Sequence, residues 1–138
     1  MRTFLFIRTV LVVLAVIPAG AARAETPADF LRTFETAARQ EQAGFGGFSA
    51  ARGAAFFNDT HGREWSCASC HGRNPAATGR HAKTDKPITP LAPAANAERF
   101  TRTTKVEKWL RRNCNDVLGR ACTPAEKGDV LTYLMSVR

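Results

Sequence analysis

The chain contains a single C-x-x-C-H pentapeptide, Cys67–His71, and this motif constrains the fold more than any other feature of the sequence. Two thiols with this spacing and a histidine directly after them form the attachment sequence of c-type haem. Each thiol can form a thioether to the porphyrin, and the histidine can bind the iron as an axial ligand. We therefore expect a fold around one covalently attached haem c, with Cys67, Cys70 and His71 as its binding residues.

The four cysteines of the chain leave a second pair, Cys114 and Cys122, outside this motif. A zinc site built from all four is an alternative, but the seven residues within the second pair exceed the usual spacing of about two to four. Such a site would also leave His71 without a role. A thioredoxin-like redox motif would be accompanied by a strand and helix pattern that the sequence lacks. The haem interpretation is favoured over both.

The first 24 residues are typical of a secretory signal peptide. Two arginines give the start a positive charge, residues 10–17 form an unbroken apolar run, and residues 22–24 read Ala-Arg-Ala, an A-x-A cleavage site. An uncleaved membrane anchor is the alternative, but a span needs roughly 20 apolar residues. We expect export to the periplasm, no stable membrane insertion, and a mature domain over residues 25–138. An exported compartment also lets disulfides persist.

The chain is strongly basic, and its charge bears on its partners. The formal net charge is +8, and loss of the three arginines of the signal lowers it to +5. Nucleic acid is not an expected partner of an exported protein, so the charge favours an acidic protein surface. Six cations form what we call the basic stripe: Arg99, Arg102, Lys105, Lys108, Arg111 and Arg112. The stripe is either a solvated helix face or a docking surface for an acidic redox partner.

Apolar residues recur at helical spacing along the chain, and no strand pattern appears. The expected helices cover residues 27–42, residues 49–57 and residues 102–113, and a last helix opens at the capping box of residues 123–126. Residues 72–97 contain four prolines and no sustained period. A loop of this length is expected to be ordered only if it wraps a bound group, here the porphyrin. The sequence therefore predicts an all-α fold.

The sixth position of the iron has several candidate ligands. An electron-carrying c-type cytochrome commonly uses a methionine from the stretch before its last helix, but this chain has only Met1, in the signal, and Met135, near its end. His61 and His81 are alternatives that we expect to be solvent-facing loop residues instead. Asn113 shares a helix face with three apolar residues. Periodicity alone leaves it either an axial ligand or a polar residue near a helix end.

Three segments resemble the class I cytochrome c plan. They are residues 52–57, the haem motif and residues 129–134. In that family the first and last helices cross closely, and a glycine permits the approach. The resemblance implies that Gly53 and Phe57 contact Val130 and Tyr133.

A sharper resemblance is to the sphaeroides haem protein family. It rests on residues 90–93 (PLAP), 99–101 (RFT), 106–115 (VEKWLRRNCN), 119–120 (GR) and 122–124 (CTP). The family consists of secreted, high-spin, oxygen-binding c-type cytochromes, in which an asparagine side chain binds the iron and leaves it on reduction. The resemblance implies that this ligand is Asn113, that a disulfide joins Cys114 to Cys122, and that a dihaem c-type cytochrome donates electrons.

The expected function is therefore that of a secreted cytochrome that takes up single electrons and, when reduced, binds oxygen, nitric oxide or similar diatomics. An asparagine amide is a weak neutral donor that binds ferric iron modestly and ferrous iron poorly, so reduction should open the site. The alternatives are a conventional electron-transfer cytochrome c with a six-coordinate haem, and a haem enzyme that consumes oxygen, peroxide or nitric oxide. The methionine positions argue against the first. The sequence has no separate acid–base constellation near the motif, so ligand binding is favoured over an enzyme.

Overall fold

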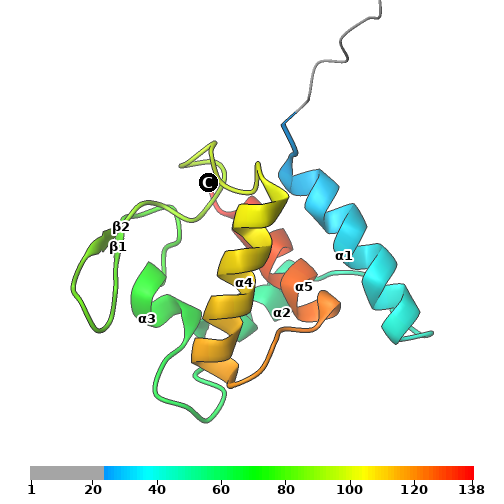
Figure 1. Cartoon of the computed structure of the whole chain (residues 1–138), viewed down its shortest axis with the longest axis horizontal. Helices are drawn as coiled ribbons and strands as arrows, with labels where there is room; N and C mark the ends of the chain where they lie inside the picture. Colours follow the sequence, from blue (N-terminus) through cyan, green and yellow to red (C-terminus); the bar gives the residue numbers. More distant parts are fainter. Residues whose placement is uncertain (1–23) are drawn as a thin grey trace, which may run out of the picture.

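The computed structural model describes residues 24–138, which contain five helices and one pair of short strands. The elements are α1 (Pro27–Glu41), α2 (Ala50–Asn58), α3 (Cys67–His71), β1 (Gly79–Arg80), β2 (Pro87–Ile88), α4 (Thr103–Leu118) and α5 (Pro124–Ser136). Figure 1 shows α4 in front of α2 and α5, with α1 on one side and α3 and the strands on the other. The predicted signal peptide lies outside the described residues, except for its last position. Within residues 24–138, no helix combines the length and the apolar character needed to span a bilayer.

The predicted all-α fold is confirmed, and helices α1, α2 and α5 begin at capping residues. The side chains of Thr26, Ser49 and Thr123 each accept a hydrogen bond from the backbone N–H three residues later. Such caps satisfy amide groups that have no partner inside the helix. In α1 and α5 the acidic side chain at that position bonds back to the cap, which completes a capping box.

Helix α4 is longer than predicted. We expected it to end at Asn113, but it continues to Leu118 because Cys114 and Val117 extend its buried face. It ends at Gly119, whose φ of 72° is in the left-handed region that favours glycine at a helix C-terminus. The extension places a disulfide cysteine inside the helix rather than after it.

The proline-containing loop forms a small hairpin that was not predicted. β1 pairs antiparallel with β2, with Gly79 opposite Ile88 and Arg80 opposite Pro87. Strands of two residues carry no alternating pattern, so the sequence has no signal for them. Beyond the hairpin, the backbone N–H groups of Leu91 and Ala92 both donate to the carbonyl of Pro75. The loop is thus ordered by hydrogen bonds of its own.

Helices α2 and α5 cross in close contact at a glycine. A Cβ atom added to Gly53 would lie 2.0 Å from the carbonyl oxygen of Asp129 and 2.9 Å from the Cβ of Tyr133. The rings of Phe57 and Tyr133 lie 5.5 Å apart. The implied contacts with Tyr133 are therefore present, but the residue that Gly53 meets in place of Val130 is Asp129.

The same crossing is held by a buried carboxylate. Asp129 accepts hydrogen bonds from the backbone N–H of Ser49 at 2.7 Å and from Nε of Arg52 at 2.7 Å. A buried carboxylate with these donors keeps its charge paired, because burial alone would strongly disfavour it. Its position fixes α5 against the start of α2.

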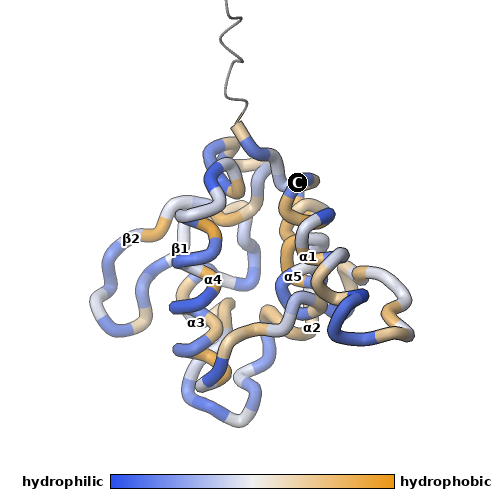
Figure 2. The backbone as a smooth tube through the Cα atoms, turned by 45° about the vertical axis from the view of Figure 1, so that its right-hand side comes forward, coloured by the Kyte–Doolittle hydropathy of each residue, from blue (hydrophilic) through white to orange (hydrophobic). Residues whose placement is uncertain are grey.

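A separate apolar cluster joins α1 to α4 and α5. Its buried members are Phe30 and Phe34 from α1, Val106 from α4 and Leu131 from α5. Burial of each such side chain contributes about 1.5–3 kcal/mol. Figure 2 shows apolar residues along α5 and mostly hydrophilic residues in the loop that joins β1 to β2. The apolar cluster therefore positions one side of α4, while the other elements border a cavity.

Candidate haem-binding site

A cavity of about 420 Å³ is bordered by α2, α3, α4, α5 and the hairpin loop. Its lining includes Cys67, Cys70 and His71 from α3 and Asn113 from α4. Many of the other lining side chains are apolar or aromatic, among them Phe57, Trp65, Leu91, Trp109, Leu110 and Val130. A cavity of this composition suits a large apolar group held by a few polar atoms.

The local fold of α3 turns the motif residues toward this cavity. Ser66 caps the helix, and its side chain and that of Ser69 form a reciprocal capping box. Cys67, Cys70 and His71 are at positions i, i+3 and i+4, which share one face of a helix. Two attachment points and one axial donor therefore lie on a single surface.

Burial sets the protonation of the motif. It raises the pKa of the Cys67 thiol to about 11, so this side chain is a neutral thiol at pH 7. Burial, together with the nearby Arg99 guanidinium, lowers the pKa of His71 to about 4. The imidazole is therefore neutral and keeps a lone pair for a metal ion. The shape of the cavity and these donors fit a covalently attached haem.

The hairpin packs directly on the motif. A Cβ atom added to Gly79 would lie 2.3 Å from the carbonyl oxygen of Cys70 and 2.9 Å from the Cα of His71. The backbone N–H of Ala82 donates to Sγ of Cys70 at 3.3 Å. Gly79 therefore permits the close approach that holds the loop against α3. This role was not predicted, because an isolated glycine in a polar segment is its only signal in the sequence.

The second ring nitrogen of His71 is expected to donate to a backbone carbonyl of the proline-containing loop, within residues 87–90, because such a bond fixes the imidazole. Among the described residues, no hydrogen bond joins His71 to those carbonyls. Instead, the carbonyl of Pro90 accepts from Nε of Arg99 at 2.9 Å and from the side-chain amide of Asn96 at 3.2 Å. Both of its lone pairs are then in use. Arg99 also donates to the carbonyl of Thr89 at 2.7 Å, so it anchors the loop beside the motif.

The two other histidines are half-buried, not solvent-facing as predicted. The His61 ring lies 4.4 Å from the Phe56 ring, and its Nε2 is 3.0 Å from the carbonyl oxygen of Phe56. His81 lines the cavity from the hairpin, and its Nδ1 accepts from the backbone N–H of Lys83. Met135 is 40% exposed at the end of α5 and is not among the residues that line the cavity.

Helix α4 forms one wall of the cavity. The predicted face of Val106, Trp109, Leu110 and Asn113 lines the cavity. Asn113 is half-buried, and no hydrogen bond to its side-chain amide is present within the described part of the chain. Its oxygen and its NH₂ group are therefore available to a group bound in the cavity.

The structure joins Cys114 to Cys122 in a disulfide, with Cα atoms 5.4 Å apart. Both cysteines are buried, with exposed fractions of 4% and 9%. Their sulfurs are bonded to each other. The zinc alternative requires these two sulfurs to bind one metal ion together with Cys67 and Cys70, so the disulfide argues against it. The disulfide links the residue after Asn113 to the start of α5.

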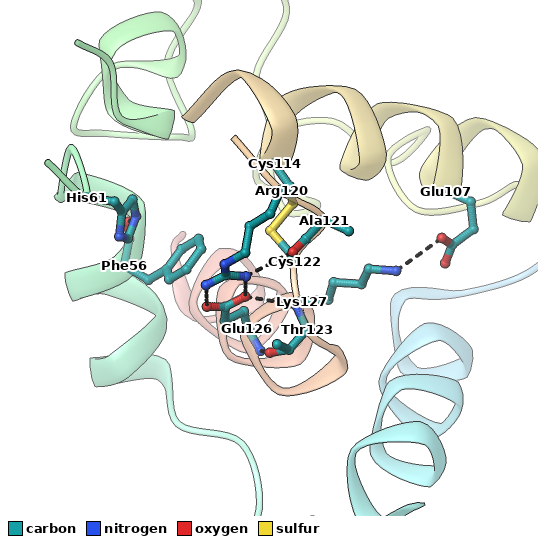
Figure 3. Close-up of a disulfide and its surroundings, with 10 residues drawn as sticks. All are labelled: Phe56, His61, Glu107, Cys114, Arg120, Ala121, Cys122, Thr123, Glu126 and Lys127. Carbon is teal, nitrogen blue, oxygen red and sulfur yellow. Dashed lines mark hydrogen bonds and ion pairs between the residues drawn. A yellow bond between two sulfur atoms is a disulfide. The ribbon is translucent and has the colours of Figure 1, made fainter. Parts of the chain in front are cut away.

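Arg120 and Glu126 form an ion pair beside this disulfide (Figure 3). Nη2 of Arg120 lies 2.7 Å from Oε1 of Glu126, and Nη1 lies 2.8 Å from Oε2. The Arg120 guanidinium lowers the pKa of the Glu126 carboxyl, and the backbone N–H of Thr123 acts in the same direction. Glu126 also lines the cavity, so this pair connects the cap of α5 to the haem site.

We expect replacement of Arg120 by glutamine to reduce stability in a pH-dependent way. A carboxyl group with a lowered folded-state pKa stabilises the fold above its unfolded pKa, and this contribution is lost as pH falls through the folded pKa. Arg120→Gln raises the pKa of Glu126 toward its ordinary value. The deficit relative to the wild type should therefore be largest at neutral pH and should shrink on acidification.

Denaturant unfolding of the holoprotein at several pH values measures this deficit. Arg39→Gln is the matched control, because it removes an exposed ion pair with Glu35 on α1, and such pairs contribute little. A deficit for Arg120→Gln that stays constant from neutral to acid pH would contradict the linkage to Glu126.

The basic stripe divides into two groups in the structure. Arg99, Arg102, Lys105 and Arg112 line the cavity, whereas Lys108 and Arg111 are exposed on α4 and are not among its lining residues. Of the lining group, Arg99 is half-buried, and burial lowers its pKa. The stripe is therefore more than a solvated face: most of its cations border the haem site.

Comparison with known proteins places these features in a family. Residues 43–134 match the family described as "Domain of unknown function (DUF1924)". The chain is 42% identical to "Cytochrome c-type protein SHP" of Cereibacter sphaeroides over 128 residues, 88% of this chain and 94% of that protein. It is 46% identical to "Cytochrome c''" of Methylophilus methylotrophus over 80 residues, 58% of this chain and 56% of that protein.

Two solved structures share the fold. Oxidized cytochrome c'' from Methylophilus methylotrophus superposes with a TM-score of 0.73 at 36% identity and covers 81% of this chain and 94% of its own. Oxidized SHP, described as an oxygen binding cytochrome c, superposes with a TM-score of 0.71 at 42% identity and covers 80% of this chain and 96% of its own. The predicted fold class is confirmed by both.

Proposed function

The chain belongs to the sphaeroides haem protein family of c-type cytochromes, and from this premise we propose that it is an exported, single-haem cytochrome whose asparagine ligand gives way to diatomic gases. Covalent haem attachment follows from the family. Cys67 and Cys70 would hold the haem, and His71 would be its proximal ligand. The number of haems, one, rests on the single C-x-x-C-H motif in the sequence.

The observation that carries the proposal is the position of Asn113. Asn113, on α4, lines the same cavity as His71, and no protein group in the described residues bonds to its side-chain amide. When bound, the haem supplies one-electron redox chemistry and, in its ferrous form, affinity for oxygen, nitric oxide and carbon monoxide. The Asn113 amide is neutral and weakly donating, so it would hold ferric iron modestly and would bind ferrous iron poorly. Its NH₂ group then remains nearby as a hydrogen-bond donor.

Electron uptake is proposed to occur from an acidic partner, for which a dihaem c-type cytochrome is the candidate that the family suggests. The exposed cations of α4, including Lys108 and Arg111, would steer such a partner toward the haem. Export to the periplasm is proposed from the signal-like residues 1–24 and is consistent with a disulfide in the fold.

Replacement of Asn113 by alanine tests the proposal. We expect Asn113→Ala to keep covalent haem, because Cys67, Cys70 and His71 are untouched, but to change the ferric absorption spectrum and to speed ligand binding to ferric iron. Asn115→Ala is the matched control, since Asn115 is exposed on the same helix and does not line the cavity. A ferric spectrum of Asn113→Ala identical to that of the wild type would remove Asn113 from the iron.

A further inference from the structure

Helix α4 has an exposed outer face that carries one sign of charge. In Figure 1 this helix lies in front of α2 and α5. Its exposed residues include four cations and one tryptophan, and we call this set the α4 face: Lys105, Lys108, Trp109, Arg111 and Arg112. The first three of these residues and Arg112 are at positions i, i+3, i+4 and i+7, which share one side of a helix.

The four cations of the α4 face are not neutralised within the fold. Across residues 24–138, no carboxylate forms an ion pair with any of them, whereas the exposed Arg39 and Arg80 each pair with an acidic residue. Of the two acidic residues of α4, Glu107 pairs with Lys127, and Asp116 lies beyond the last of the four cations. Like charges three or four residues apart destabilise a helix. Folding therefore does not account for this cluster of cations, whereas an anionic partner would.

Trp109 belongs to two surfaces of α4. It is 43% exposed, and it also lines the haem cavity together with Asn113. The Arg112 guanidinium lies over its ring, with Cζ 5.6 Å from the ring centroid, a cation–π contact that holds the indole in place. Tryptophan and arginine are enriched in the residues that dominate protein–protein binding. The α4 face thus combines an aromatic anchor with cations around it.

We propose that the α4 face is the docking surface for an acidic redox protein and that Trp109 is its central contact. The cations steer the acidic partner, and Trp109 supplies apolar contact area directly beside the haem cavity. A second copy of the chain does not suit this face, because the two cationic surfaces would repel each other. This inference rests on the proposed uptake of electrons from an acidic partner, and it locates that partner on the chain.

The test uses flavodoxin, an acidic one-electron redox protein, as the probe. Calorimetry at low salt measures the affinity of oxidised flavodoxin for the ferric holoprotein, a pair that transfers no electron. Lys108→Glu/Arg111→Glu reverses two charges outside the cavity lining, and we expect the dissociation constant to rise at least about tenfold and to depend less on salt. Arg73→Glu/Lys86→Glu is the matched control, because these cations are also exposed and outside the cavity lining. Its effect should stay below about threefold.

Trp109→Ala separates the aromatic anchor from the charges. It should raise the dissociation constant about tenfold and keep the salt dependence of the wild type, because no charge is changed. Stopped-flow reduction gives a second readout. Flavodoxin hydroquinone donates one electron and becomes the semiquinone, and its second-order rate with Lys108→Glu/Arg111→Glu should fall as the affinity does. Reduction of the same variant by photoreduced lumiflavin, a small uncharged donor, should match the wild type.

Equal weakening by the two double variants would show that only net charge matters and would overturn the α4 face, as would a larger effect of Arg73→Glu/Lys86→Glu. Wild-type affinity of Trp109→Ala would overturn its central place. Binding to phosphatidylglycerol vesicles that Lys108→Glu/Arg111→Glu abolishes, without flavodoxin binding, would assign the face to a lipid surface instead.

These outcomes leave the proposed gas binding to be judged by carbon monoxide addition to the ferrous holoprotein. Wild-type reduction by flavodoxin hydroquinone that does not depend on salt would overturn both the docking face and the acidic partner.

Discussion

Replacement of Asn113 by methionine is expected to close the gas site. A thioether is a stronger ligand for ferrous haem iron than an amide and raises the reduction potential. Asn113 lines the same cavity as His71, and a methionine that binds the iron from this position would stay bound after reduction. Carbon monoxide must then displace the thioether from the iron. If the free energy of thioether binding to ferrous iron is about 3 kcal/mol, the apparent affinity for carbon monoxide falls roughly 100-fold.

The measurement is carbon monoxide titration of ferrous Asn113→Met, followed by its absorption spectrum. A low-spin ferrous spectrum and weak binding are expected. Asn115→Met, on the exposed side of α4, is the control and should bind the gas like the wild type. An Asn113→Met protein with wild-type affinity and a high-spin ferrous spectrum would mean that this position does not reach the iron.

Replacement of Gly53 by alanine is expected to cause the largest loss of stability. The added Cβ would lie 2.0 Å from the carbonyl oxygen of Asp129. The backbone of α2 fixes the position of this Cβ and the carbonyl belongs to the backbone of α5, so neither atom can move away unless a helix shifts. Overpacking of this kind costs about 3 kcal/mol. Alanine is normally favoured over glycine inside a helix by about 1 kcal/mol. A net decrease in the free energy of unfolding would therefore be due to the clash where α2 crosses α5.

Denaturant unfolding of the ferric holoprotein measures this change in the free energy of unfolding. Gly44→Ala is the matched control, because nothing lies within 4 Å of its added Cβ and the change should stay within about 0.5 kcal/mol. Equal stability of Gly53→Ala and Gly44→Ala would show that the contact between α2 and α5 is not as close as described.

The helices were predictable because their signals are local. Thr26, Ser49 and Thr123 are capping residues followed by apolar residues at helical spacing, and each begins a helix as expected. The end of α4 was not predictable in this way. After Asn113 the polar residues Asn115 and Asp116 interrupt the pattern, and only tertiary burial of Cys114 and Val117 shows that the helix continues.

The haem site was predictable to the extent that it depends on motif and periodicity. The motif and the face of α4 that carries Asn113 both line the cavity. The contacts that the proline-containing loop makes with the motif were not predictable. Arg99 donates to the carbonyl of Pro90, one of the carbonyls within residues 87–90 that were candidates to accept from His71, and Gly79 brings the hairpin onto the motif. Both contacts depend on how the loop folds back onto α3, and no local pattern in the sequence indicates this. The ligand role of Asn113 remains a prediction.

The most direct test of the central claim is the absorption spectrum of the holoprotein, ferric and ferrous, before and after carbon monoxide is added to the ferrous form. An asparagine ligand that leaves on reduction predicts a high-spin ferrous spectrum that shifts promptly and completely with the gas. A low-spin ferrous spectrum that does not respond to the gas would mean that a strong sixth ligand stays bound. That result would contradict the role of Asn113 and favour a conventional electron carrier.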